Sequence, residues 1–362
     1  MLSVAIIGTQ GLPAKYGGFE TLADQIVRLL GMRFDFTVYC SGVSYPKRPH
    51  KYRNAKLKYL PFKANGLQSI IYDCCALFDA ILNCDVLLVL GVSGCVFLSI
   101  LRIISHKKFI VNVDGIEWKR DKWGFFAKCF LRFSELVAVR SAHEIIADNL
   151  GIANYLFLEY QIRAVTIEYG GNQVLSSRMR KKNENENSSY CFAVCRIEPE
   201  NNIHVMLKAF TDSNHKIVIV GNWNDSKYGR KLRNIYRLHC NITMCDPIYD
   251  LQKLNDLRCG CMLYLHGHSA GGTNPSLVEA MWLGLPIVAY DVKYNRFTTE
   301  NKAYYFSNEA QLKELIQLLY LAPEKRNSIG SMMKETAEKK YRWDFIVEQY
   351  AKILKSTQKI IS

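Results

Sequence analysis

The sequence has few acidic side chains for its size and lacks a long hydrophobic segment. Its 362 residues contain 33 Asp and Glu against 47 Lys and Arg, which gives a formal net charge of +14. This excess favours anionic partners, such as phosphate-bearing small molecules or an acidic membrane surface. The basic residues are not interleaved with an aromatic platform, which argues against nucleic acid. The charge-free run from Val86 to Leu101 is shorter than the about 20 residues of a membrane span. We expect a buried strand, a turn and a covered helix there, and no transmembrane segment.

Zinc-ligand spacings and a cleavable leader are also missing. Most of the 12 cysteines lie in apolar runs, where a free thiol acts as a small hydrophobic group. Cys259 and Cys261 have no second pair at zinc spacing, so we expect buried structural thiols and no metal. The apolar stretch from Leu2 to Ile7 runs into a glycine turn without a basic leader or a cleavage site. We therefore expect a cytoplasmic protein.

Short apolar runs alternate with helical patterns along the chain. Such runs are typical of parallel strands covered on both faces, and repeated strand–helix units predict doubly wound α/β sheets. The polar, aperiodic stretch 176–189 interrupts the pattern and is typical of a linker. We therefore expect an α/β chain with two Rossmann-like domains, 1–175 and 190–340, facing each other across a cleft. The amphipathic stretch 341–362 is expected to form a helix that packs back on the N-terminal domain.

Glycines and polar side chains follow two of the predicted N-terminal strands. The loop from Gly8 to Glu20 lies between a strand and a helix but has neither the G-x-G-x-x-G nor the Walker spacing. A structural turn and an anion-binding loop are about equally good interpretations. Asp114, Glu117 and Trp118 follow another strand. They form either an Asp turn beside a solvated basic face or an acceptor-sugar site, in which the carboxylates accept hydrogen bonds from hydroxyls and Trp118 stacks on a ring.

The second domain offers the stronger motif. Arg196 follows its first strand, where a guanidinium can hold a diphosphate through charge-assisted hydrogen bonds. Further on, a glycine-containing loop leads from a strand into a helix, and the backbone N–H groups of 272–276 are expected to face a phosphate. Glu279, about one turn further, would chelate a ribose diol, and its apolar neighbours mean that it needs a partner in the fold. His266 and His268 in the same loop are either satisfied histidines or site residues.

Taken together, these segments resemble family-4 retaining glycosyltransferases of the GT-B fold. The resemblance rests on Arg196 with the Glu-Pro-Glu-Asn-Asn run, on Gly-Thr-Asn-Pro-Ser-Leu-Val-Glu-Ala-Met at 272–281 and on Gly-Leu-Pro-Ile-Val-Ala at 284–289. The N-terminal glycine loop and Asp-Gly-Ile-Glu-Trp-Lys-Arg at 114–120 narrow it to the bacterial rhamnosyltransferase-type branch that builds capsule, O-antigen and rhamnan polysaccharides. The resemblance spans nearly the whole chain.

The resemblance implies a nucleotide-sugar donor, commonly dTDP-L-rhamnose in this branch, and transfer with retention of anomeric configuration. The nucleotide-sugar is a substrate, so neither a metal nor a cofactor is expected. The catalytic candidates are Asp114, Glu117 and Arg196. The donor-binding candidates are Arg196, Asn201, Gly221, Asn222, Ile248, Tyr249, Gly271, Gly272, Thr273, Asn274, Pro275, Ser276 and Glu279. The acceptor-binding candidates are Gly11, Tyr16, Gly17, Gly18, Glu20 and Trp118.

Three positions depart from the family pattern. Gly271 stands where the wider family has a carboxylate that contacts the donor sugar, and Asn201 stands where it has a lysine. Asp114 stands in place of the usual histidine of the N-terminal domain. These departures leave the sugar open, so a UDP- or GDP-hexose donor is an alternative. A non-catalytic nucleotide- or carbohydrate-binding protein is another, and a GT-B epimerase would need an acid/base pair that the sequence does not clearly offer.

A basic segment runs from Lys47 to Lys63, with seven Lys and Arg and no acidic residue. It is either a solvated loop or a contact to the anionic inner face of the cytoplasmic membrane, where each basic residue contributes about 1 kcal/mol. A lipid-diphosphate-linked saccharide acceptor would lie at that face, which would make the protein peripheral to the membrane.

Overall fold

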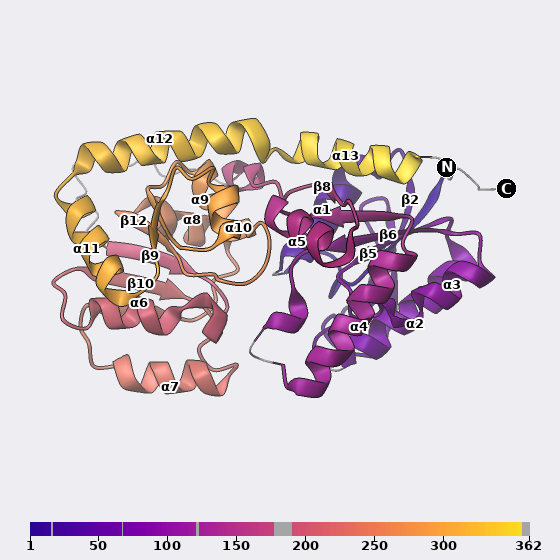
Figure 1. The fold of residues 1–362 in the computed structure, drawn as a ribbon, viewed down its shortest axis with the longest axis horizontal. Coiled ribbons are helices and arrows are strands. Elements are labelled where there is room, and N and C mark those ends of the chain that lie inside the picture. The colour runs from indigo at the N-terminus through magenta and orange to yellow at the C-terminus, as the bar shows by residue number, and fades with distance from the viewer. Residues whose placement is uncertain (16, 67, 121–122, 177–189, 357–362) are drawn as a thin grey trace. The chain divides into compact units, whose positions relative to one another are not determined.

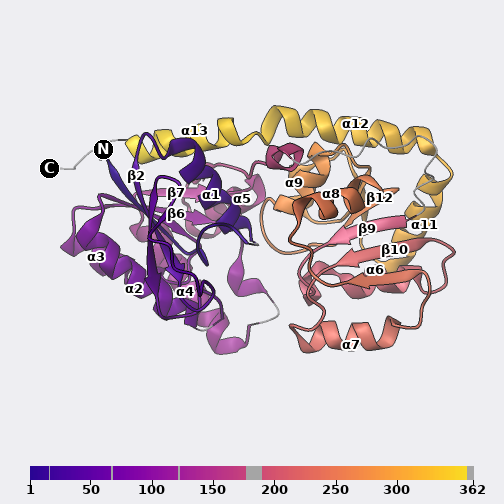
Figure 2. The same cartoon turned by 180° about the vertical axis from the view of Figure 1, so that it is seen from behind.

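The computed structural model describes residues 1–15, 17–66, 68–120, 123–176 and 190–356, which fold into two compact units (Figure 1). Unit 1 comprises Met1–Glu168 and the C-terminal segment from Trp343 onward, and unit 2 comprises Tyr169–Arg342. Of the predicted linker 176–189, residues 177–189 lie outside the described residues. Figure 2 shows the same two units from behind.

Within its described residues, unit 1 has an eight-stranded sheet in the order β3-β4-β2-β1-β5-β6-β7-β8, parallel except for the β3–β4 pair. Its central strand β5 is buried along its whole length, as a charge-free run predicts for a strand covered on both faces. The strands are β1 (Ser3–Ile7), β2 (Asp35–Ser41), β3 (Lys51–Tyr52), β4 (Ala55–Leu60), β5 (Val86–Leu90), β6 (Lys108–Val113), β7 (Glu144–Ala147) and β8 (Val165–Thr166).

Helices cover both faces of this sheet. They are α1 (Gly18–Leu30), α2 (Gln68–Asn83), α3 (Leu98–Ile104), α4 (Phe125–Ser141), α5 (Leu150–Tyr160) and α13 (Trp343–Lys355), with the short 3₁₀ turns η1 (Cys95–Phe97) and η2 (Glu117–Lys119). The C-terminal helix α13 packs on α1, where Arg33 forms an ion pair with Glu348. Asn112 at the end of β6 also donates a hydrogen bond to Tyr350 of α13, at 2.7 Å.

The expectation of a covered helix after Val86–Leu90 is wrong for α3. This helix buries Leu98 and Leu101, but Ile100, Ile103 and Ile104 are exposed. The helix spans only two turns and packs on α4 and η1, so its apolar residues lie both on the face that it buries and on the face that it exposes.

Unit 2 has, among its described residues, a six-stranded parallel sheet in the order β11-β10-β9-β12-β13-β14. Strands β10 and β11 follow β9 on one side of it, and β12, β13 and β14 follow on the other side, so the strand order reverses between β9 and β12. The strands are β9 (Tyr190–Val194), β10 (Lys216–Val220), β11 (Ile242–Cys245), β12 (Leu263–His266), β13 (Ile287–Tyr290) and β14 (Tyr304–Phe306). The helical elements are η3 (Asn172–Ser176), η4 (Pro199–Asn201), α6 (Ile203–Phe210), α7 (Lys227–Tyr236), α8 (Leu251–Cys259), α9 (Pro275–Trp282), α10 (Lys293–Thr298), α11 (Glu309–Tyr320) and α12 (Pro323–Lys340).

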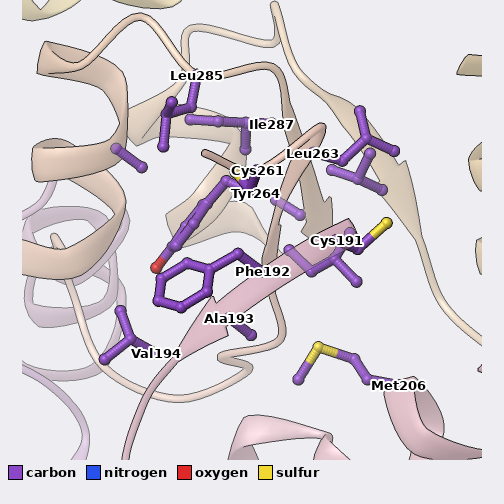
Figure 3. Packing of buried hydrophobic residues seen from close by; sticks show 14 of the residues in the cluster. Cys191, Phe192, Ala193, Val194, Met206, Cys261, Leu263, Tyr264, Leu285 and Ile287 are labelled. Carbon is purple, nitrogen blue, oxygen red and sulfur yellow. The ribbon is translucent and has the colours of Figure 1, made fainter. Parts of the chain in front are cut away.

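The core of unit 2 lies around β9 and β12. Phe192 of β9 pairs in register with Tyr264 of β12, and their ring centroids are 6.4 Å apart (Figure 3). Met206 of α6 is part of the same buried cluster. These contacts fix the carboxyl ends of β9 and β12 next to each other. In a doubly wound sheet, the place where strand order reverses is the usual ligand-binding edge.

Candidate functional site

Arg196 lies two residues beyond β9, at this edge of unit 2. Its side chain is 52% exposed, and its Nε lies 3.7 Å from a carboxylate oxygen of Glu198. Asn201, five residues further on, is buried, and its amide donates a 2.7 Å hydrogen bond to the backbone carbonyl of Arg196. Asn201 therefore holds the backbone beneath Arg196, while the guanidinium of Arg196 remains accessible to an anion.

The segment after β12 leads into α9 as the sequence predicts. Asn274 is the N-cap, and its Oδ1 accepts hydrogen bonds from the backbone N–H and the hydroxyl of Ser276, while Pro275 takes the first helical position. The Ser276 N–H is thus bonded within the cap. Gly271 has a φ of +111°, and a Cβ placed there would meet no atom within 4 Å. The turn therefore needs a glycine, and it borders open space.

Glu279 has the partner that its apolar setting requires. Its Oε2 accepts a hydrogen bond from Arg258 of α8, and its Oε1 accepts one of 2.8 Å from Gln173 of η3. Arg258 is almost fully buried and also donates to Asn255 at 3.1 Å. Asn255 in turn donates to the Val174 carbonyl. Each carboxylate oxygen of Glu279 has a second lone pair, so the carboxylate is fixed in place and can still accept a hydrogen bond from a hydroxyl.

The other predicted donor-binding residues lie at the ends of β10 and β11. A Cβ on Gly221 would lie 2.5 Å from the Cys195 carbonyl, so this glycine is required where two strand ends pack. Asn222 is exposed and Ile248 is half-buried. Tyr249 is 69% exposed. Their roles toward a ligand stay predictions.

Two buried side chains at the same edge have polar atoms without a hydrogen-bond partner among the residues that the structure describes. Both carboxylate oxygens of Glu200 and both ring nitrogens of His266 are in this state. His266 stacks on His268, with ring centroids 4.4 Å apart, and on Tyr264, at 6.1 Å. Burial lowers the pKa of His266 to about 3, so its ring is neutral at physiological pH. Buried polar atoms normally have partners, so these groups are places where water or a ligand would bind.

In unit 1, side chains of the same unit hold the loop between β1 and α1. Buried Glu20 accepts a 2.7 Å hydrogen bond from the Gln10 N–H. Gly17 has a φ of +142°, and a Cβ there would lie 1.8 Å from the Glu20 carboxylate. The Gly11 carbonyl accepts a hydrogen bond from Tyr45. Gly18 is the first residue of α1. Tyr16 lies outside the described residues, so the acceptor-binding role of this loop stays a prediction.

The second N-terminal segment is likewise engaged within unit 1. The carboxylate of Glu117 pairs with Arg120 at 2.8 Å and accepts a 3.0 Å hydrogen bond from Trp123. The indole N–H of Trp118 lies 3.4 Å from buried Glu135. Arg132 and Lys119 lie over its ring, at 5.1 and 5.2 Å from the centroid.

These contacts bear on the predicted roles of the segment. The side chains of Glu117 and Trp118 are held by neighbours of their own unit. Asp114 is half-buried after β6. Catalysis by Asp114 and Glu117, and sugar stacking by Trp118, stay predictions.

The structure thus gathers Arg196, the Gly271–Ser276 loop and Glu279 at the carboxyl ends of neighbouring strands in unit 2. Sequence reasoning missed Arg258 and Gln173, which fix Glu279. A signal was present, because an arginine among the hydrophobic positions of a helix requires an acidic partner.

Three further facts concern metals, thiols and membranes. Among the described residues, no three His, Cys, Asp or Glu side chains gather as a metal ion would require. The twelve cysteines, all in the described part of the chain, are free thiols. No helix of the described ranges is long and apolar enough to cross a membrane.

Family models match the two halves of the chain separately. Residues 176–336 match the model described as Glycosyl transferases group 1, and residues 1–172 match one described as Domain of unknown function (DUF1972). A search of curated proteins gave no match.

Solved structures resemble the chain over nearly its whole length. The sucrose-phosphate synthase of Thermosynechococcus elongatus has a TM-score of 0.82 at 14% identity, over 98% of both chains. HepE of Anabaena in complex with UDP-glucose has a TM-score of 0.77 at 15% identity, over 99% of this chain and 100% of that chain. A glycosyltransferase of Rickettsia africae has a TM-score of 0.74 at 11% identity, over 98% of each chain. At such identities the likeness shows the fold, which is GT-B. With this fold, and with a domain that matches the group 1 glycosyl transferases, the protein is a GT-B glycosyltransferase.

Proposed function

We propose that this glycosyltransferase moves L-rhamnose from dTDP-L-rhamnose to a lipid-linked saccharide in the synthesis of a bacterial cell-surface polysaccharide, with retention of the anomeric configuration. The observation that carries the donor half of the proposal is the Glu279 carboxylate. It lies one turn inside α9 and is held by buried Arg258 and by Gln173. A carboxylate fixed in this way is suited to accept a hydrogen bond from the single 3′ hydroxyl of the deoxyribose of dTDP. The same carboxylate would accept hydrogen bonds from both hydroxyls of the ribose of a UDP-linked donor.

Arg196 is proposed to hold the diphosphate. In the transfer, the bond between the anomeric carbon and the diphosphate oxygen breaks, and a bond to an acceptor hydroxyl oxygen forms as that hydroxyl loses its proton. Negative charge grows on the leaving diphosphate, and the guanidinium of Arg196 stabilises it. Ile248 and Tyr249 are proposed to flank the nucleobase. Asp114 of unit 1 is proposed to accept a hydrogen bond from a hydroxyl of the acceptor.

A UDP-hexose is the second candidate donor. HepE, which shares the fold, was solved with UDP-glucose. Gly271 brings no carboxylate to bind hydroxyls of the donor sugar. This favours rhamnose as the donor sugar, because a deoxysugar has fewer hydroxyls that need a partner than a hexose has. The choice between them is made by experiment.

The acceptor is proposed to be a saccharide linked to a lipid diphosphate at the inner face of the cytoplasmic membrane. The formal net charge of +14 supports such a location for a peripheral protein.

A donor panel tests the proposal. Purified protein is incubated with dTDP-L-rhamnose, UDP-glucose or GDP-mannose, and donor loss is followed with and without a lipid-linked acceptor. We expect consumption of dTDP-L-rhamnose. We also expect NMR to show that the new glycosidic bond has the same anomeric configuration as the bond to the diphosphate in the donor. If only UDP-glucose is consumed, the donor is a UDP-hexose and not dTDP-L-rhamnose.

Arg196→Ala is expected to weaken dTDP binding by about tenfold to a hundredfold, because one charge-assisted contact to the diphosphate is lost. Thymidine binding should not change, since it has no diphosphate. Isothermal titration calorimetry measures both. Because the Arg196 side chain is half-exposed, its removal should change the free energy of unfolding little. The control is Arg237→Ala, which removes an exposed arginine of the same unit. Equal loss for dTDP and thymidine would remove Arg196 from the diphosphate site.

A further inference from the structure

Three helices of unit 1 carry apolar side chains on faces that no part of the described chain covers. The inner face of α2 buries Tyr72 and Leu77, yet Ile71, Phe78 and Leu82 are exposed on one stripe of the same helix. The exposed large hydrophobic side chains of α2, η1, α3 and α4 are Ile71, Phe78, Leu82, Phe97, Ile100, Ile103, Ile104, Phe125, Phe126 and Phe133, with exposures from 40% to 86%. We call this set the outer face.

The helical elements that carry the outer face contact one another. The rings of Phe78 in α2 and Phe97 in η1 are 5.8 Å apart. Ser99 of α3 hydrogen-bonds Ser141 of α4, and Arg102 donates to the Ser141 carbonyl at 3.0 Å. Both views show α2, α3 and α4 together in unit 1 (Figures 1 and 2).

Positive charge lies among these apolar side chains. Arg102 and Arg140 are exposed on α3 and α4, whereas Arg132 of α4 is exposed but pairs with Glu159. Within the three helices, all of whose residues are described, no acidic residue is exposed: Asp73 and Glu135 are buried, and the remaining one, Asp79, pairs with Lys58. The exposed carboxylates next to these helices, Asp85 and Glu159, pair with Lys107 and Arg132. An apolar surface whose helices expose arginines and no carboxylate matches an anionic lipid surface, because phosphates contact the guanidinium groups while the rings enter the acyl boundary.

We propose that the outer face docks this protein on an anionic lipid bilayer. The proposal rests on the proposed function, in that a lipid-linked acceptor places the enzyme at a membrane. It assigns the contact to a surface other than the Lys47–Lys63 segment.

The basic segment is the weaker contact for a physical reason. Arg53, Lys56 and Lys58 form ion pairs with Asp24, Asp35 and Asp79. Part of its charge is therefore neutralised within the fold, and β3 and β4 offer no exposed large hydrophobic side chain.

Vesicle co-sedimentation tests the proposal with the full chain. The outer-face variant is Ile103→Ser/Phe125→Ser/Phe126→Ser. The control is Leu238→Ser/Leu321→Ser/Phe345→Ser, which removes three exposed apolar side chains elsewhere. With vesicles that contain phosphatidylglycerol, we expect the outer-face variant to bind at least about tenfold more weakly than the wild type, and the control to bind like the wild type. Arg102→Gln/Arg140→Gln should weaken binding to these vesicles but not to phosphatidylcholine alone.

Other results would overturn the proposal. Wild-type binding by the outer-face variant would do so, as would loss of binding only on charge reversal across Lys47–Lys63. If light scattering shows a wild-type dimer that the outer-face variant converts to a monomer, and neither binds vesicles, the face is a contact between two copies.

The docking proposal and the proposed function can fail separately. Affinity for dTDP without lipid should be equal in the wild type and the outer-face variant, because the substitutions are exposed and outside unit 2. If the wild type binds no nucleotide-sugar but shows face-dependent vesicle binding, the proposed function fails and the docking surface stands.

Discussion

Replacing Arg258 by methionine is expected to lower the free energy of unfolding of unit 2 by about 3–5 kcal/mol, the cost of removing one partner of a buried ion pair. Arg258 is almost fully buried between Asn255 and Glu279. Its loss leaves the Glu279 carboxylate, with 17% of the side chain exposed, without its cation. Donor affinity should fall as well, because Glu279 loses the contact that fixes it. Urea unfolding followed by circular dichroism and nucleotide titration measure the two effects.

A double variant separates these two consequences. In Arg258→Met/Glu279→Met both charges are gone, and stability should recover in large part, since a buried ion pair can be replaced by apolar side chains at little cost. Nucleotide binding should not recover. Arg233→Met is the control, because Arg233 pairs with Asp246 at the surface of the same unit, and we expect a change of about 0.5 kcal/mol or less. If Arg258→Met unfolds like the wild type, the pair does not stabilise unit 2.

The pair also changes what a substitution of Glu279 alone reports. Glu279→Ala leaves Arg258 buried without a counter-charge. It therefore lowers stability as well as donor affinity, and loss of binding by this single variant cannot be assigned to the ribose contact. The comparison with the double variant makes that assignment.

Local patterns predicted the elements that carry the candidate site. Asn274 and Pro275 marked the start of α9, because a capping side chain and a proline at the first position both satisfy helix geometry without tertiary contacts. The run at β5 was predicted for a similar reason, since a charge-free stretch of strand length is buried wherever it pairs.

Contacts between distant segments were not predictable in this way. The apolar neighbours of Glu279 indicated that its carboxylate needs a partner, but not which helix supplies it. Arg258 and Gln173 lie 21 and 106 residues away in the sequence. The prediction for α3 was wrong because the helix is apolar on all sides. Its sequence pattern therefore does not indicate which residues face the protein and which face outward. The same ambiguity hid the outer face of α2.

Acidification is expected to destabilise unit 2 through His266. Burial lowers the pKa of this group from 6.5 to about 3, so the unfolded chain binds a proton that the folded chain excludes. Because the unfolded state binds more protons in this window, stability falls as the pH drops from about 6.5 toward 3, by about 1.4 kcal/mol per pH unit. Between pH 7 and pH 5 the loss amounts to about 2 kcal/mol, which calorimetric or urea unfolding at a series of pH values detects.

His266→Leu isolates this contribution. The variant has no proton to bind, so the difference in stability between it and the wild type should grow steadily below pH 6.5 in favour of the variant. At neutral pH the variant should be no less stable, because it also removes two buried nitrogens that have no hydrogen-bond partner in the described part of the chain. His239→Leu, a partly exposed histidine of the same unit, is the matched control and should keep the wild-type slope. A wild-type slope in His266→Leu would mean that the ring is protonated in the folded protein, with a water or a neighbour supplying the partner that its nitrogens lack.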